Sequence, residues 1–152
     1  MAETLARVGE RYSRAMGRAF VGADSPGAPV VRYFDAAADN LVASAFADGC
    51  PVGTVTLEVA TTNERLRAAC AEVFSRWEQT LVDGFVTAGI SEAVARDLAT
   101  LFLVNLEGAL VLSRARHDAA PLRRAGAVVA AAVDAELPRP ARRRRRGEQR
   151  QR

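Results

Sequence analysis

Few side chains in this sequence could carry out nucleophilic, redox or metal chemistry. The chain has two cysteines, Cys50 and Cys70, and one histidine, His117, and none of them lies in a CxxC or HExxH spacing. Such spacings are what would indicate a zinc site or a redox pair. We therefore expect no metal site and no disulfide, with both cysteines serving as small core residues.

The chain also offers little for acid–base catalysis. All of its basic residues are arginine, and the single histidine falls in a predicted turn, so carboxylates would have to do the work. Glu58 and Glu107 are the only acids inside strongly apolar runs. No nucleophile elbow, phosphate-binding loop or dinucleotide motif is present. We expect a protein that is not an enzyme and has no cofactor, and keep a small helical enzyme using Glu58 or Glu107 as an alternative.

Glu107 has two further interpretations. Because buried charges are normally paired, it could form a structural ion pair or a hydrogen bond at a helix seam, for example with Arg114 of a second subunit. It could also bind a ligand. The sequence alone leaves both open.

Charge is distributed unevenly along the chain. Residues 1–138 hold 13 Arg against 17 acidic residues, whereas 139–152 hold 8 Arg and one Glu. We expect residues 138–152 to be a disordered tail, because they contain almost no apolar side chains to bury. The arginine run 142–146 could contact nucleic acid non-specifically, or it could be a solvated terminus with no fixed role.

Helical spacing dominates the rest of the chain, which we expect to be one domain over residues 1–137. Apolar residues recur every three or four positions in each predicted helix. A capping box from Thr61 to Glu64 predicts the start of the fourth helix, and Gly89 with Ser91 predicts its separation from the fifth. The long predicted helices cover residues 2–21, 30–46, 61–88, 92–115 and 121–137.

One stretch looks different, since residues 54–59 alternate apolar and polar side chains as a strand would. No other segment supplies a partner strand, so the backbone groups of a strand here would be unpaired. Pro51 suits the first turn of a helix instead. We therefore predict a short helix after Gly49 and Cys50, and an all-α, antiparallel domain of about six helices.

The predicted helix 92–115 is apolar on two opposite faces. Such a helix needs two burial partners, and we expect one to be the domain's own core and the other a second subunit. Residues 121–137 are rich in small side chains that let helix axes approach closely. The last two long helices should thus form a four-helix bundle in a homodimer, with a seam made by Leu103, Glu107, Leu110, Val111, Arg114, Val128, Val129 and Ala132.

Aromatic side chains gather on one stripe of the predicted helix 61–88 and continue onto the next helix. An aromatic lining with a few polar groups suits a small-molecule pocket between helices, although the same residues could simply pack as core. As pocket lining we select Phe74, Trp77, Leu81, Phe102 and Asn105.

Three features in a fixed order carry a family resemblance. They are the Gly-Cys-Pro that precedes Glu58, the Phe-x-x-Trp of Phe74 and Trp77, and the Glu-Gly-Ala-Leu at 107–110 followed by Ser-Arg-Ala. Over residues 3–135 the chain resembles the C-terminal regulatory domain of TetR-type transcriptional repressors, in the LmrA/YxaF-like branch. The resemblance implies an all-helical domain that dimerises through its last two helices and binds a small, often hydrophobic effector. Effector binding in this family shifts two helix-turn-helix heads and releases DNA.

The resemblance also sets expectations about DNA and location. The chain begins at the helix that follows the helix-turn-helix in TetR-type repressors, so we expect DNA contact only through a head that is absent here. The predicted function is an effector-sensing and dimerisation domain. The alternative is a stand-alone dimeric module that forms mixed dimers with a full-length repressor. We expect a cytoplasmic protein without a membrane partner, because the first residues are charged and the apolar runs are interrupted.

Overall fold

The structure, a computed structural model, describes residues 1–59 and 61–137, and over these residues it contains six helices and no strand. The all-α prediction is therefore confirmed, while the predicted arginine-rich tail lies outside the described residues. The helices are α1 (Ala2–Phe20), α2 (Ala28–Ala43), α3 (Pro51–Val59), α4 (Glu64–Thr87), α5 (Glu92–Arg116) and α6 (Ala120–Ala135).

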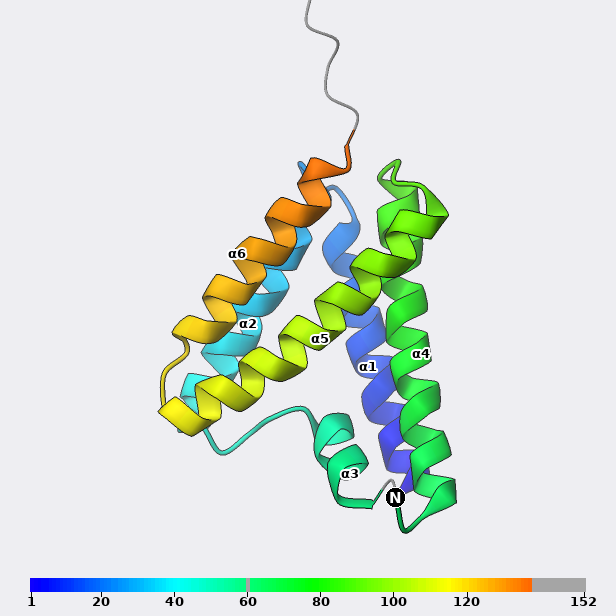
Figure 1. Ribbon diagram of the computed structural model, residues 1–152, viewed down its shortest axis with the longest axis vertical. Coiled ribbons are helices and arrows are strands. Elements are labelled where there is room, and N and C mark those ends of the chain that lie inside the picture. Colours follow the sequence, from blue (N-terminus) through cyan, green and yellow to red (C-terminus); the bar gives the residue numbers. More distant parts are fainter. Residues whose placement is uncertain (60, 138–152) are drawn as a thin grey trace, which may run out of the picture.

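Two helix pairs are joined by a helix that crosses both. α1 packs along α4, α2 packs along α6, and α5 runs diagonally over them with contacts to α4 and α6 (Figure 1). The turn between α4 and α5 is tight because Gly89 adopts a positive φ of 96°, which glycine tolerates without strain. α4 and α5 consequently run in opposite directions, as predicted.

The short helix and its neighbour show how local sequence sets helix starts. α3 begins at Pro51, where a missing backbone N–H removes no helical hydrogen bond. The capping box predicted from Thr61 is wrong, because α4 is capped by Asn63, whose side chain accepts a hydrogen bond from the Leu66 backbone N–H at 3.1 Å. Asparagine caps a helix as well as threonine does, and it lies directly before the first helical residue.

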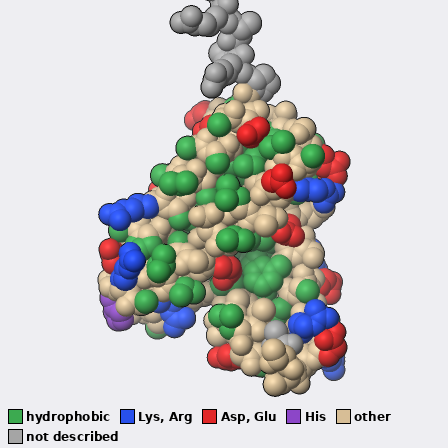
Figure 2. All heavy atoms as spheres, in the orientation of Figure 1, with side chains coloured by type: hydrophobic (Ala, Val, Ile, Leu, Met, Phe, Trp, Pro, Cys, Tyr) green, Lys and Arg blue, Asp and Glu red, His purple; other side chains and the backbone are tan. Residues whose placement is uncertain are grey.

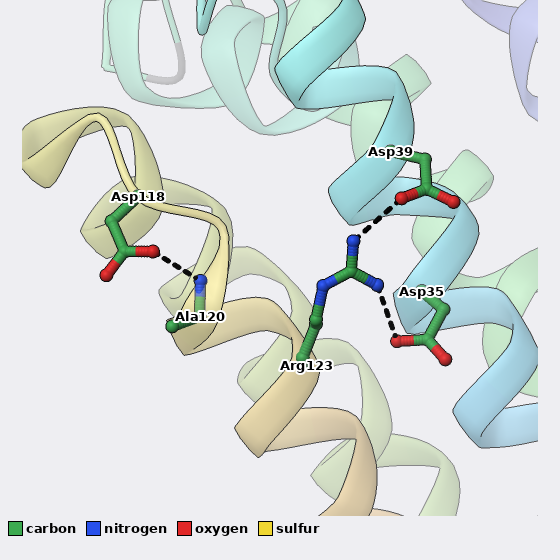
Figure 3. Close-up of polar contacts among 5 residues, drawn as sticks. All are labelled: Asp35, Asp39, Asp118, Ala120 and Arg123. Carbon is green, nitrogen blue, oxygen red and sulfur yellow. Dashed lines mark hydrogen bonds and ion pairs between the residues drawn. The ribbon is translucent and has the colours of Figure 1, made fainter.

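The small residues of α6 pack against α2 of the same chain. A Cβ atom added at Gly126 would lie 2.5 Å from the Cβ of Phe34, so glycine is needed for the two helices to approach this closely. Arg123 of α6 also forms ion pairs with α2, at 3.1 Å to Asp35 and 2.7 Å to Asp39 (Figure 3). The close approach that the sequence predicted for α6 is thus explained within one protomer.

At the start of α6, the Asp118 side chain accepts a hydrogen bond from the Ala120 backbone N–H at 2.9 Å (Figure 3). This bond satisfies one of the backbone donors that a helix leaves free in its first turn. The position of α6 is therefore set by a local cap as well as by its packing on α2.

The core is centred on aromatic rings from four helices. Phe34 of α2 meets Phe102 of α5 edge-on with ring centroids 5.1 Å apart, and Phe20 of α1 meets Phe85 of α4 in the same way at 5.4 Å. Phe34, Phe85 and Phe102 are fully buried. By length and composition α5 is apolar enough to cross a membrane, and in the structure it packs on α4 and α6.

Candidate ligand-binding cavity

A cavity of about 730 Å³ lies between α1, α2, α5 and the linker that precedes α3. Small side chains create its space, because alanines line the stretches of α1 and α2 that face it. Aromatic and aliphatic side chains share the remaining wall with polar and charged ones. The lining includes Tyr12, Ala15, Tyr33, Ala37, Cys50, Trp77, Leu106, Glu107 and Leu110.

The aromatic walls are held in place by contacts outside the cavity. The Trp77 indole N–H donates a hydrogen bond to the Gly9 carbonyl at 2.9 Å, which fixes the ring between α4 and α1. The Tyr12 ring lies 5.7 Å from Trp77, and the Tyr33 ring lies 5.4 Å from Phe102. A ligand would therefore meet aromatic surfaces that are already positioned.

Glu107 is the one acidic side chain in the inner part of this wall. Its Oε1 atom is buried and has no hydrogen-bond partner among the described residues. Its Oε2 atom lies against Gly53, where an added Cβ would be only 2.5 Å away. Glycine at position 53 therefore leaves room for the carboxylate between α5 and the first turn of α3.

Burial raises the pKa of three neighbouring titratable groups, Glu107, Cys50 and Tyr33. Burial raises the pKa of Glu107, an effect that the neighbouring Cys50 thiol only partly offsets. Burial, followed by the charge of Glu107, raises the pKa of the Cys50 thiol to about 12. Burial also raises the pKa of Tyr33 above its usual value. At neutral pH the thiol and the phenol thus keep their protons.

The two arginines at the rim of the cavity have other partners. The Arg32 guanidinium donates to the Ala19 carbonyl at 2.8 Å, and the Arg11 guanidinium lies 5.5 Å above the Tyr12 ring. Both side chains are exposed. Neither forms an ion pair with Glu107.

The sequence offered Arg114 of a second subunit as a partner of Glu107, and within this chain Arg114 contacts the linker instead. Its Nε donates to the Phe46 carbonyl in the linker after α2, at 3.4 Å. Within residues 1–59 and 61–137, Glu107 has no cationic partner at all.

The sequence also matches a known family. Residues 26–128 match the family described as the C-terminal domain of LmrA/YxaF-like transcriptional regulators. The chain belongs to this family.

Relatives of this LmrA/YxaF-like domain are named as HTH-type transcriptional regulators. This chain is 31% identical over 127 residues to Rv0196 of Mycobacterium tuberculosis, which is named as uncharacterized. The match covers 80% of this chain and 63% of Rv0196. The chain is 36% identical over 74 residues to YxaF of Bacillus subtilis, also named as uncharacterized (49% and 39% of the two chains). It is 31% identical over 75 residues to LmrA of the same organism (49% and 40%). The chain thus spans less than two thirds of the length of these relatives, which are named as transcriptional regulators.

Of the five residues predicted to line a pocket, only Trp77 lines this cavity. Phe74 packs edge-on against Trp77 with centroids 5.5 Å apart, and Leu81 and Phe102 are buried in the core of the LmrA/YxaF-like domain. Asn105 lies on the outward side of α5, beside a shallow groove shared with α6. Core packing is therefore the role of Phe74, Leu81 and Phe102.

The sequence-based prediction missed the wall that α2 and the linker contribute. Tyr33 and Cys50 face the cavity, yet they do not lie on the apolar face that the periodicity of residues 30–46 defines. The signal that could have found them is the set of alanines beside Tyr33, at positions 36 and 37. Small residues next to an aromatic on one helix face leave space that the aromatic borders.

The residues that were predicted to form the dimer seam lie in three different environments. Leu103 and Val129 are 6% and 0% exposed, and Ala132 packs against the same core, so these three residues face the interior of this chain. Glu107 and Leu110 line the cavity, and the exposed Arg114 donates to the linker. Val111 and Val128 remain on the surface, 59% and 66% exposed.

The outward face of α5 and α6 is apolar nevertheless. Figure 2 shows hydrophobic side chains gathered over these two helices on the side toward the viewer. The exposed members follow helical spacing along α5 and end on α6. They are Leu101, Val104, Val111, Leu112 and Val128.

Proposed function

We propose that this chain is the effector-sensing and dimerisation domain of a TetR-type transcriptional regulator. The observation that carries the proposal is the cavity of about 730 Å³, with aromatic walls and one half-buried carboxylate. Sites for small molecules are commonly about 300–1,000 Å³, mostly apolar, with a few polar groups that orient the ligand. The cavity therefore suits a small and mainly hydrophobic effector.

The cavity is placed where a ligand could influence the N-terminal helix. Tyr12 and Ala15 bring α1 into the wall, and Leu106 and Leu110 bring α5 into it from the other side. A ligand that fits between them would change the position of α1 relative to α5. DNA recognition would belong to a helix-turn-helix unit, as the names of the relatives indicate, and α1 would transmit the change to it. This function would be exercised in the cytoplasm.

Dimerisation is the second part of the proposal. The apolar outward face defined by Leu101, Val104, Val111, Leu112 and Val128 is much more exposed than the core-facing side of the same helices. Contiguous exposed apolar surface typically marks an interaction site. A second copy of the chain would cover it with the same face, and a full-length relative could do so in a mixed dimer.

Trp77 fluorescence tests the ligand site, since Trp77 is the only tryptophan of the chain. We expect a saturable change when a hydrophobic ligand binds. Ala15→Phe should weaken binding by filling the cavity, whereas the matched control Ala68→Phe, on the exposed surface of α4, should not. Saturable binding that is unchanged by Ala15→Phe would place the ligand somewhere else.

A further inference from the structure

The unpartnered carboxylate in the cavity indicates what kind of ligand fits there. An ionised carboxylate that loses water without gaining a cation or a donor is unfavourable by several kcal/mol. The buried Oε1 of Glu107 has no hydrogen-bond partner in the described part of the chain, and the donor beside this carboxylate is the uncharged Cys50 thiol. A bound molecule that brings a positive charge would supply a partner.

We propose that the effector is an amphipathic cation, with a protonated amine that binds Glu107 and an apolar body that contacts the aromatic walls. This inference rests on the proposed effector-binding function and specifies the ligand class for the same cavity.

The aromatic surroundings favour such a ligand for a second, independent reason. Tyr12, Tyr33 and Trp77 all line the cavity that contains Glu107. Aromatic faces attract cations through their quadrupole, and the attraction grows when the site excludes water. The Arg11 guanidinium above Tyr12 shows that one of these rings already accepts a cation at the rim.

Apart from Glu107, the titratable groups in the interior of the cavity are neutral. Tyr33 from α2 and the Cys50 thiol from the linker remain neutral at physiological pH, since burial raises the pKa of each. Tyr12 contributes a phenol from α1. No cation from these elements approaches the carboxylate closely enough to form an ion pair in the described structure.

At the rim, the remaining charged groups are exposed to solvent. Arg11, Arg32 and Asp48 are the three charged residues that line this part, and water screens exposed charges strongly. Arg114 is also exposed and donates to the linker. Selection by charge should therefore come from Glu107, with cations bound best, neutral molecules next and anions worst.

Three ligands that share one aromatic body test this order. They are 1-naphthylmethylamine, which is protonated at neutral pH, 1-naphthalenemethanol and 1-naphthoate. Calorimetric titration of the intact chain should show the amine binding about 10- to 100-fold more tightly than the alcohol, as expected for one charge-assisted hydrogen bond. The carboxylate should bind more weakly than either.

Glu107→Gln should remove the preference for the amine while leaving the affinity for the alcohol nearly unchanged. Asp48→Asn is the matched control, because it removes an acid at the exposed rim, and it should preserve the preference. Lowering the pH should weaken amine binding alone, since burial raises the pKa of Glu107 and protonation abolishes its charge. Circular dichroism confirms that each variant is folded.

The outcomes separate this inference from the proposed function. Equal affinities for the amine and the alcohol, or a preference that survives Glu107→Gln, would overturn the cationic ligand class and leave the cavity as a binding site. Failure of all three ligands to bind at millimolar concentration would contradict both the ligand class and the cavity as an effector site.

Discussion

α5 has two apolar faces, one buried inside the domain and one exposed. Toward the interior, Phe102 and Leu106 are buried and Glu107 borders the cavity. Toward the outside, Val104 and Val111 are 65% and 59% exposed although they are equally apolar. The difference shows that apolar residues on a helix face predict that something covers this face. What covers it depends on how the helix is rotated in the fold.

The acidic residues divide in a similar way. Asp35 and Asp39 share Arg123 on the surface, where their charges are paired and hydrated (Figure 3). Glu107 lies deeper and has an oxygen without a partner. The paired aspartates join α2 to α6, while the unpaired glutamate is the group to which a ligand could bind.

The largest effect should come from the inner face of α5. Phe102→Ala removes a ring that is 1% exposed and contacts both Phe34 and Tyr33. We expect it to lower the free energy of unfolding by about 3–5 kcal/mol, from lost burial and the cavity left behind. Denaturant unfolding of dilute protein measures this loss. Leu101→Ala, on the more exposed side of α5, should cost far less, and equal losses would contradict the assignment of the two faces.

The outer face should control association and leave the fold intact. Val104→Glu places a charge in the proposed interface, and we expect the dimer dissociation constant to rise about 100-fold, since burying an unpaired charge opposes association. Analytical ultracentrifugation measures the change. Val31→Glu, on the exposed side of α2, is the control that should still dimerise. A wild-type chain that stays monomeric at tens of micromolar would reject the outer face as a dimer surface.

Glu107 should make stability depend on pH. Because burial raises its pKa in the folded state, the native protein binds the proton more tightly than the unfolded chain does. The stability that this bound proton contributes is complete below the pKa of Glu107 in the unfolded chain. It is lost as the pH rises through the pKa of Glu107 in the folded protein. Glu107→Gln should remove this decline in the free energy of unfolding, whereas Glu58→Gln, on the exposed surface of α3, should keep it. A wild-type curve parallel to that of Glu107→Gln would contradict the burial of this carboxylate.

The smallest effect concerns the reactivity of Cys50. Its pKa of about 12 keeps the thiol protonated, so alkylation by iodoacetamide at pH 8 should be much slower than in the unfolded chain. Glu107→Gln should speed the reaction modestly, because it removes a negative charge that opposes the thiolate. Peptide mass spectrometry distinguishes Cys50 from Cys70, which is buried and serves as the internal control. A rate equal to that of the unfolded chain would show that Cys50 is not shielded.

Helix positions were largely predictable because their signals are local. Proline at the first turn of α3, glycine after α4 and the spacing of apolar residues depend only on neighbours within a few positions. The start of α4 was misplaced because two capping residues, Thr61 and Asn63, compete within three positions. The structure selects the asparagine.

The site was less predictable, since a cavity is defined by what several helices leave unfilled. Trp77 was selected because aromatic side chains gather on the stripe of the predicted helix 61–88, and Phe102 was selected because it continues this lining onto the next helix. Phe102 instead fills the core between Tyr33 and Phe34. The alanines that create the cavity look in sequence like ordinary helix formers.

By itself, the sequence determined an all-helical domain, the approximate extent of each helix and the family to which the chain belongs. Those properties follow from local propensities, from hydrophobic periodicity and from short motifs kept in order. Only the tertiary structure decided that Glu107 and Leu110 border the cavity while Val104 and Val111 face outward. The physical reason is that the rotation of α5 about its axis is fixed by its packing on α4 and α6, and helical spacing alone does not specify that rotation.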